Sequence, residues 1–228
     1  MTISEKLYTH ANLITSPFYL KNDGRHDLRH RDTVTTRGQA FVNIATEEVS
    51  KRSVFIGTMY HDIAHHINPK KHEEISAQIC EDDKGLRRFF SHDEIIQICQ
   101  GIEDHRASLD GDPRNTIGKI ISSADRRVCM TDFLESTYTY RLTNSPEFDL
   151  QKIIDDSYLY TLKKFGNDGY ANDKMYFPDL EYSAFLQQIK AMTTDKDLFI
   201  SNYLQMVNNY HKNQVSTTSI NDLCLNIN

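Results

Sequence analysis

The chain has 228 residues, of which 39% are hydrophobic and 25% charged, with a formal net charge of −6 and a pI near 5.9. This composition is typical of a soluble globular protein with one well-buried core, and the acidic balance argues against a general nucleic-acid-binding protein. The N-terminal residues lack a basic segment followed by an apolar one, and no run of about 18 apolar residues occurs, so we expect neither a signal peptide nor a membrane span.

The first half of the chain has the pattern of successive amphipathic helices. Apolar residues in 1–21 predict a short helix, which we expect Pro17 to break, and 22–24 predicts a turn. Ser91 is a candidate N-cap, and Glu94 three residues later completes a capping box. The further predicted helices of this half cover about 26–49 with an interruption at Gly38, 53–65, 72–82, 92–105 and 117–130.

Beyond residue 145 the predicted helices are rich in Tyr and Phe. They cover about 148–165, 178–192 and 195–211, and the tail 212–228 is expected to fray. The aromatic positions favour core packing, with a lid over a site or a homodimer face as alternatives. No stretch has the pattern of a strand, so we predict an all-α fold: a single domain over 1–228, with a helical bundle core at about 22–130 and a C-terminal extension at about 145–211.

The four cysteines lie far apart and form no CxxC pair. This usage favours reduced core thiols in a cytoplasmic protein. The residues are Cys80, Cys99, Cys129 and Cys224.

The segment from Tyr60 to His65 places an imidazole beside a carboxylate at the end of an apolar run, in the order Tyr-His-Asp-Ile-Ala-His. Imidazole and carboxylate together suit a divalent cation such as Mn, Fe, Zn, Ni or Mg. One His-Asp pair is a weak signal, but further His and Asp residues lie at the ends or on the inner faces of predicted helices, where a bundle can direct them toward one ion. The candidates are His26, His30, His61, Asp62, His65, His72, His105 and Asp125.

Each candidate also has a structural explanation. A buried histidine is more often a hydrogen-bonded core residue than a ligand, His72 could be a solvated cap at a helix start, and Asp125 could pair with an arginine. The functional interpretation gains weight because the structural one must explain all eight residues separately.

The order of these motifs resembles the HD superfamily of metal-dependent phosphohydrolases, over about residues 22–130. Two departures concern substrate contacts. Thr33-Val34 stands where the family often has Arg-Val, so a phosphate-contacting arginine is either missing or replaced by Arg37, and the segment after Asp125 lacks a second acidic residue. The resemblance is carried by the segments Arg25-His26-Asp27-Leu28-Arg29-His30, Thr58-Met59-Tyr60-His61-Asp62-Ile63-Ala64, Lys71-His72-Glu73 with Ser76-Ala77, Asp104-His105-Arg106-Ala107-Ser108 and Ile120-Ile121-Ser122-Ser123-Ala124-Asp125-Arg126.

The resemblance implies a role for each matching residue. His26 resembles the general-acid histidine of related phosphodiesterases, His65 matches a histidine that supports the ligands or faces the substrate, and Arg126 is a candidate phosphate clamp, with a structural ion pair as the alternative. The implied ligands are His30, His61, Asp62 and Asp125 for a first metal ion, and His72 and His105 for a second ion that Asp62 bridges.

The activity implied by the resemblance is hydrolysis of a nucleotide-like or other small phosphate ester by a metal-activated water. The cofactor would be one or two divalent ions (Mn, Fe, Ni, Co, Zn or Mg), and we expect neither a nucleic acid polymer nor a membrane as partner. Two alternatives stay open. One is a di-iron HD-type oxygenase, and the other is a non-catalytic HD module for sensing or interaction, which the loss of a core ligand would favour.

Overall fold

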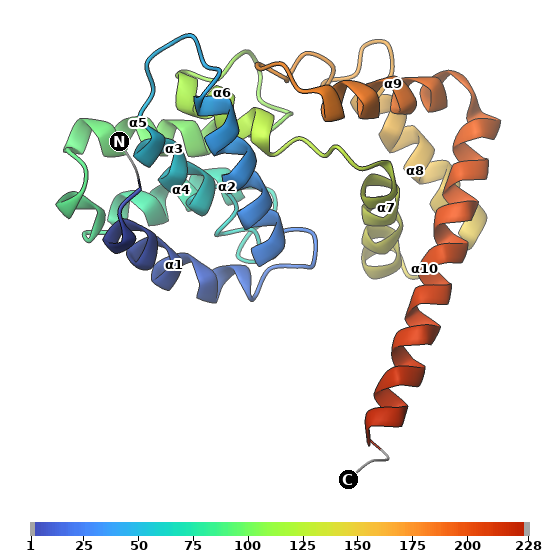
Figure 1. Cartoon of the computed structure of the whole chain (residues 1–228). Helices are drawn as coiled ribbons and strands as arrows, with labels where there is room; N and C mark the ends of the chain where they lie inside the picture. The colour runs from blue at the N-terminus through green and yellow to red at the C-terminus, as the bar shows by residue number, and fades with distance from the viewer. Residues whose placement is uncertain (1–2, 226–228) are drawn as a thin grey trace. The chain divides into compact units, whose positions relative to one another are not determined.

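Helices form in this chain wherever apolar residues recur three and four positions apart, and the predicted all-α class is confirmed: the described residues contain helices and turns but no strand. The computed structural model describes the backbone of residues 3–225 and the side chains of residues 3–213 (Figure 1). The elements in chain order are α1 (Glu5–Tyr19), α2 (Leu28–Val42), α3 (Lys51–Tyr60), α4 (His72–Asp82), the 3₁₀ turn η1 (Leu86–Arg88), α5 (His92–Glu103), α6 (Thr116–Ala124), α7 (Met130–Asn144), α8 (Leu150–Phe165), α9 (Leu180–Thr194) and α10 (Lys196–Leu225).

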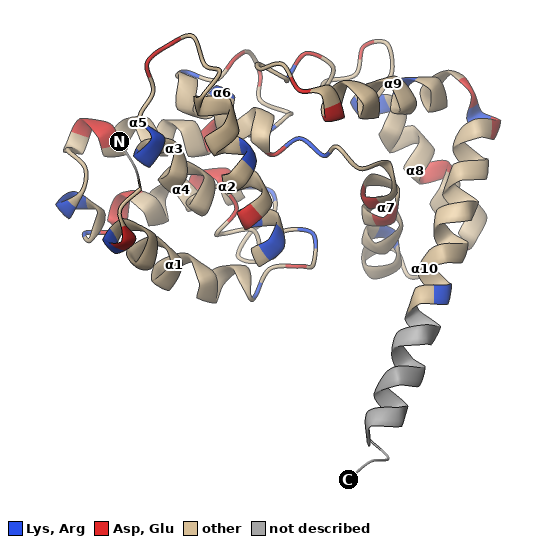
Figure 2. Ribbon diagram, viewed as in Figure 1, with Lys and Arg blue, Asp and Glu red and all other residues tan. Residues whose placement is uncertain are grey.

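The chain divides into two compact units. The first comprises Met1–Arg126 with Asp173–Pro178 and contains α1 to α6, and the second comprises Arg127–Asn172 with Asp179–Asn228 and contains α7 to α10. The organisation as one domain over 1–228 stays a prediction. In the first unit, Lys and Arg residues are interspersed with Asp and Glu residues over the helices and loops (Figure 2).

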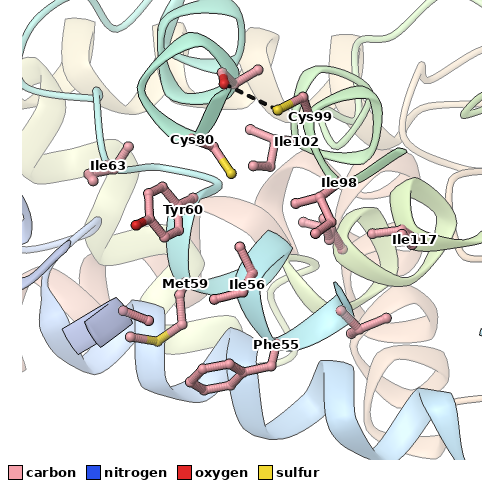
Figure 3. Packing of buried hydrophobic residues seen from close by; sticks show 14 of the residues in the cluster. Phe55, Ile56, Met59, Tyr60, Ile63, Cys80, Ile98, Cys99, Ile102 and Ile117 are labelled. Atoms are coloured by element: carbon pink, nitrogen blue, oxygen red, sulfur yellow. Dashed lines mark hydrogen bonds between the residues drawn. The ribbon is translucent and has the colours of Figure 1, made fainter. Parts of the chain in front are cut away.

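Helix α3 forms the centre of the first unit, because every residue from Ser53 to Tyr60 is buried. It packs against α2, α5 and α6, while α4 packs along α5. Figure 3 shows this core, in which Ile56 of α3, Cys80 of α4 and Ile98 of α5 meet. Each such fully buried aliphatic side chain stabilises the fold by about 1.5–3 kcal/mol. The ends of these tightly packed helices therefore have well-defined positions, which matters for the side chains that follow them.

Several helix ends differ from the predicted ones. Helix α3 ends at Tyr60 rather than at 65, and turn bonds follow it, such as His65 N–H to the Asp62 carbonyl at 3.0 Å. Helix α2 begins only at Leu28, because the Asp27 carboxylate accepts hydrogen bonds from the first backbone N–H groups of the helix. His26 therefore precedes the helix, although its ring still lies edge to face with that of His30 at a centroid distance of 5.7 Å.

One further helix ends earlier than predicted, and another continues past its predicted end. Helix α6 ends at Ala124, so Asp125 is its C-cap residue rather than an interior position. Helix α1, in contrast, continues through Pro17 to Tyr19. A proline so close to the end removes only one of the last hydrogen bonds of the helix, so the predicted break does not occur. The capping box of Ser91 and Glu94 is present as predicted.

The second unit is a four-helix arrangement whose first helix, α7, was not predicted. Its buried positions form no strong apolar stripe, since they include Thr137 and Arg141. The other three helices were predicted. Aromatic residues build the core: Phe133 of α7, Phe165 of α8 and Phe185 of α9 meet edge to face with ring centroids 5.5–5.9 Å apart. The tail was predicted to fray from residue 212, but the backbone of α10 continues as a helix to Leu225, which corrects that prediction; residues 226–228 lie outside the described part of the chain.

The described cysteines are free thiols. Cys80 and Cys99 are buried as predicted, and the Cys99 thiol donates to the Ala77 carbonyl at 3.4 Å (Figure 3). Cys129 is exposed, which corrects its assignment to the core: it precedes α7, where the chain leaves the first unit. Cys224 lies outside the described side chains. No helix in the described part of the chain is both long and apolar enough to cross a membrane.

Candidate metal centre

All six residues predicted as metal ligands lie in the first unit, each at or near a helix end. The structure brings them into two groups whose donor atoms lie within 4.8 Å of one another and which share Asp62. Side chains at helix ends can converge from several directions, because the chain turns there and the helices need not face one another along their length. The positions are His30 in the first turn of α2, His61 and Asp62 directly after α3, His72 at the start of α4, His105 after α5, and Asp125 at the C-cap of α6.

The first group consists of His30, His61, Asp62 and Asp125. His30 Nε2 lies 3.3 Å from Asp62 Oδ2 and 3.2 Å from Asp125 Oδ1. His61 Nε2 lies 3.2 Å from His30 Nε2 and 3.4 Å from Asp62 Oδ2. Two imidazole nitrogens and two carboxylate oxygens thus surround one point.

The second group consists of His72, His105 and the same Asp62. Here the facing atom is Asp62 Oδ1, which lies 3.0 Å from His72 Nε2 and 3.4 Å from His105 Nε2. The two Nε2 atoms are 3.3 Å apart. Asp62 therefore presents one carboxylate oxygen to each pair of histidines, as a residue that bridges two ions would.

The orientation of these rings is fixed by hydrogen bonds at their other nitrogen. Three of the four rings donate from Nδ1 to the backbone carbonyl three residues earlier, which leaves the Nε2 lone pair directed into the centre. At His72 and His105 the two lone pairs therefore point at each other and repel, with the Nε2 atoms 3.3 Å apart. A cation between them removes this repulsion. The bonds run from His61 to Thr58 (2.8 Å), from His72 to Pro69 (3.0 Å) and from His105 to Ile102 (2.6 Å).

Asp62 Oδ1 supplies a further indication that this centre suits a cation. The atom is buried, yet it has no hydrogen-bond partner among the described residues. A buried carboxylate oxygen without a partner is costly, and a metal ion is one of the few groups that satisfies it. The residues of both groups therefore fit divalent ions bound by imidazole nitrogen and carboxylate oxygen.

The two carboxylates and His30 stabilise each other's charged forms. Burial alone would raise the pKa of Asp62, but His61, His105 and His30 outweigh it and hold the pKa of Asp62 well below its usual range. The pKa of Asp125 is also lowered, by His30 and Arg126, against the effect of burial. For His30 the proximity of Asp125 and Asp62 exceeds the effect of burial and raises its pKa to about 9. Both carboxylates are thus ionised and ready to bind a cation at neutral pH.

Two arginines hold Asp125 in place. The buried Arg126 guanidinium donates to the carbonyls of Ser122 (2.7 Å) and His105 (2.9 Å) and lies 3.4 Å from Asp125 Oδ2. Arg37 donates to the carbonyl of Ala124 at 2.6 Å and to that of Arg126. Both guanidinium groups are engaged with backbone carbonyls around the C-terminal end of α6, which favours a supporting role for Arg126 over the predicted phosphate clamp.

His26 and His65 lie beside the two groups. Their rings stack with centroids 3.6 Å apart and 18° between the planes, and the centroid of His65 lies 5.2 Å from that of His72. Asp23 Oδ1 lies 2.8 Å from His26 Nδ1 and so orients that ring. Burial, with a contribution from His26, lowers the pKa of His65 to about 4, so that this ring is neutral at physiological pH.

Three residues around the centre were not singled out as site residues in the sequence. Asn22 and Asp23 were noted only as part of a turn, and Tyr19 only as an apolar position. Tyr19 Oη accepts the backbone N–H of Asp62 (3.2 Å), and Asn22 Nδ2 donates to the Asp62 carbonyl (2.9 Å). The side chains of Tyr19 and Asn22 act through the backbone of a distant residue, and no local pattern in the sequence reports such a contact; Asp23 instead orients the nearby ring of His26.

Fold and site together define an all-α protein with a candidate centre for divalent metal ions built from histidine and aspartate at helix ends. A model of the HD domain family matches residues 30–130 of the chain. The chain therefore contains an HD domain over these residues, and all six of the clustered His and Asp residues lie in it. Comparison with curated proteins finds no match, and comparison with solved structures finds none either. HD domains are generally metal-dependent hydrolases, which agrees with the donor set of this centre.

Proposed function

We propose that this protein is a metal-dependent phosphohydrolase that acts on a nucleotide-like or other small phosphate ester. The observation that carries the proposal is the position of Asp62, whose two carboxylate oxygens face two separate pairs of histidines. His30, His61, Asp62 and Asp125 would hold a first ion, and His72 and His105 a second. A divalent ion at such a site supplies Lewis acidity, which lowers the pKa of water toward roughly 7 and neutralises charge on phosphoryl oxygens.

The residues of the chain contribute orientation and proton transfer. The carbonyls that accept from Nδ1 keep the Nε2 atoms of His61, His72 and His105 directed inward. His26 lies beside the centre with its Nδ1 held by Asp23, which leaves its other ring nitrogen to protonate a leaving oxygen. General acid catalysis of this kind is worth roughly 10²–10⁴ in rate. Arg37 and Arg126 keep Asp125 in position through the backbone.

A metal analysis joined to an activity screen tests this proposal. The purified protein is analysed for bound metals, supplied with Mn, Co or Ni, and assayed for phosphate release from a generic aryl phosphate and a panel of nucleotides. We expect activity that needs the metal, and we expect His61→Ala and Asp62→Ala to lose both metal and activity. His92→Ala is the matched control, because His92 is exposed at the start of α5. Release of phosphate from none of these compounds would refute the proposal.

A second candidate function is oxidation by a di-iron centre. The observation in its favour is the second histidine pair, His72 and His105, opposite the free oxygen of Asp62, because such a set can hold two irons as well as two other ions. Iron content after anaerobic purification and oxygen uptake distinguish it from hydrolysis. We further propose that the substrate is a small phosphorylated molecule. We also expect the protein to act in the cytoplasm, since buried free thiols such as Cys80 and Cys99 suit a reducing compartment.

A further inference from the structure

Both backbone polar groups of Asp62 are bound by side chains from the segment 19–22, which covers the last residue of α1 and the turn after it. Tyr19 Oη accepts the Asp62 N–H at 3.2 Å, and Asn22 Nδ2 donates to the Asp62 carbonyl at 2.9 Å. The same Tyr19 oxygen lies 3.4 Å from His61 Nδ1. This segment precedes the part of the chain that matches the HD family, which begins at residue 30.

Asn22 uses its whole amide group to join its own loop to the turn that follows α3. Besides the Asp62 carbonyl, its Nδ2 donates to the carbonyl of His26 at 2.9 Å. Its Oδ1 accepts from the backbone N–H of His66 at 2.9 Å and lies 2.9 Å from the Nδ1 of the same residue. One side chain therefore fixes the distance between the turn that carries Asp62 and the loop that carries His26.

The position of this contact explains why it is needed. Because α3 ends at Tyr60, Asp62 lies in a turn, and the Thr58 carbonyl that a continued helix would offer to its N–H lies 2.8 Å from His61 Nδ1 instead. Without Tyr19 and Asn22, the backbone of Asp62 could rotate and carry its carboxylate away from one of the histidine pairs. A shift of about 1 Å is enough to spoil a metal or catalytic site.

We propose that Asn22, together with Tyr19, is a positioning residue of the metal centre: it fixes the backbone of Asp62 so that one carboxylate oxygen faces each histidine pair, and it sets His26 beside them. The inference rests on the metal-binding part of the proposed function. It does not depend on which reaction the centre performs.

Manganese binding to the full chain tests this role. We compare the wild-type protein with Asn22→Ala and Tyr19→Phe, and with Asn43→Ala as matched control, because Asn43 is an exposed residue after α2 whose amide only accepts from Lys51. The affinity for Mn²⁺ and the number of bound ions are measured by titration, and the unfolding temperature is measured with and without Mn²⁺. Loss of residues that support metal ligands typically costs about 10–100-fold in affinity.

We expect Asn22→Ala to bind Mn²⁺ about 10–100-fold more weakly and to lose most of the Mn²⁺-induced rise in unfolding temperature, with a smaller effect for Tyr19→Phe and none for Asn43→Ala. A purely structural role would lower the unfolding temperature of the metal-free protein and leave the affinity unchanged, and that result overturns the proposal. If Asn22→Ala does not fold, Tyr19→Phe decides: unchanged affinity overturns the proposal and weaker affinity supports it.

The same measurements separate this inference from the proposed function. If Asn22→Ala weakens Mn²⁺ binding but the wild-type protein hydrolyses no phosphate ester, the positioning role stands and the phosphohydrolase proposal fails. If the wild-type protein binds no Mn²⁺, Co²⁺ or Ni²⁺, the positioning role is overturned. Hydrolysis together with unchanged Mn²⁺ affinity in both variants overturns the positioning role alone.

Discussion

At the scale of single residues, the centre depends on the protonation of its histidines. A metal ion binds the neutral imidazole, so a protonated ligand must lose its proton first. His30 is the ligand for which this matters most, because Asp125 and Asp62 raise its pKa to about 9. His105 differs, since burial lowers its pKa and keeps the ring neutral. Two ligands of one centre thus respond differently to pH because they face different numbers of carboxylates.

We therefore expect the affinity for Mn²⁺ to increase with pH between about 6.5 and 9. In the metal-free protein the raised pKa of His30 stabilises the fold fully below 6.5, and this stabilisation is lost as the pH rises through about 9. Metal binding releases that proton, so affinity should increase up to about tenfold per pH unit over the same window. Titration of Mn²⁺ at several pH values measures the slope. An affinity that does not change with pH would contradict the raised pKa of His30.

At the scale of helices, the close approach of α5 and α6 positions the residues that follow them, His105 and Asp125. The two helices meet at glycines: a Cβ atom on Gly118 would lie 3.3 Å from the Cα of Gly101. A Cβ on Gly101 would lie 2.8 Å from Ile117 Cγ2 and 3.0 Å from the backbone nitrogen of Gly118. Backbone cannot move aside as a flexible side chain can, so larger residues at these positions must separate the helices.

Gly101→Ala should destabilise the protein in spite of the higher helix propensity of alanine. Propensity favours alanine by about 1 kcal/mol, whereas overpacking against a backbone costs about 1–3 kcal/mol, so we expect a net loss of up to about 2 kcal/mol. Urea unfolding measures it. Gly24→Ala is the control, because a Cβ there meets no atom within 4 Å. Equal stability of Gly101→Ala and the wild type would show that α5 and α6 can separate freely.

At the scale of the whole chain, the first unit includes a segment from far along the sequence. Residues Asp173–Pro178 pack with it, between two stretches that belong to the second unit. Tyr176 donates its backbone N–H to Ser123 Oγ at 3.0 Å, and Phe177 stacks on Phe41 with centroids 5.4 Å apart. Ser123 precedes Asp125 by two residues, so this segment supports the end of α6 that carries a candidate ligand.

Phe177→Ala in the full chain should lower the free energy of unfolding of the first unit by about 1–3 kcal/mol, less than for a fully buried phenylalanine because the side chain is only partly buried. Leu180→Ala, at a side chain that is 90% exposed, is the matched control and should change it by less than about 0.5 kcal/mol. Denaturant unfolding followed by circular dichroism measures both. Equal stability of the two variants would mean that the first unit does not need residues Asp173–Pro178.

The sequence by itself determined the all-α class, the HD family and the six His and Asp residues of the centre. Helical periodicity and capping boxes such as Ser91 with Glu94 are local, and donor chemistry belongs to the residue type, so both can be recognised in a linear pattern. The binding of metal by these six residues stays a prediction, although the structure brings all of them together.

Only the tertiary structure decided where the helices end, that Asp62 faces two histidine pairs, and that Arg37 and Arg126 are engaged by backbone carbonyls. It also placed Tyr19 and Asn22 on the backbone of Asp62. Apart from the start of α2, which the adjacent Asp27 caps, these features share one physical reason. They depend on contacts between segments tens of residues apart, whose partners are chosen by the packing of the core and not by their neighbours in the chain.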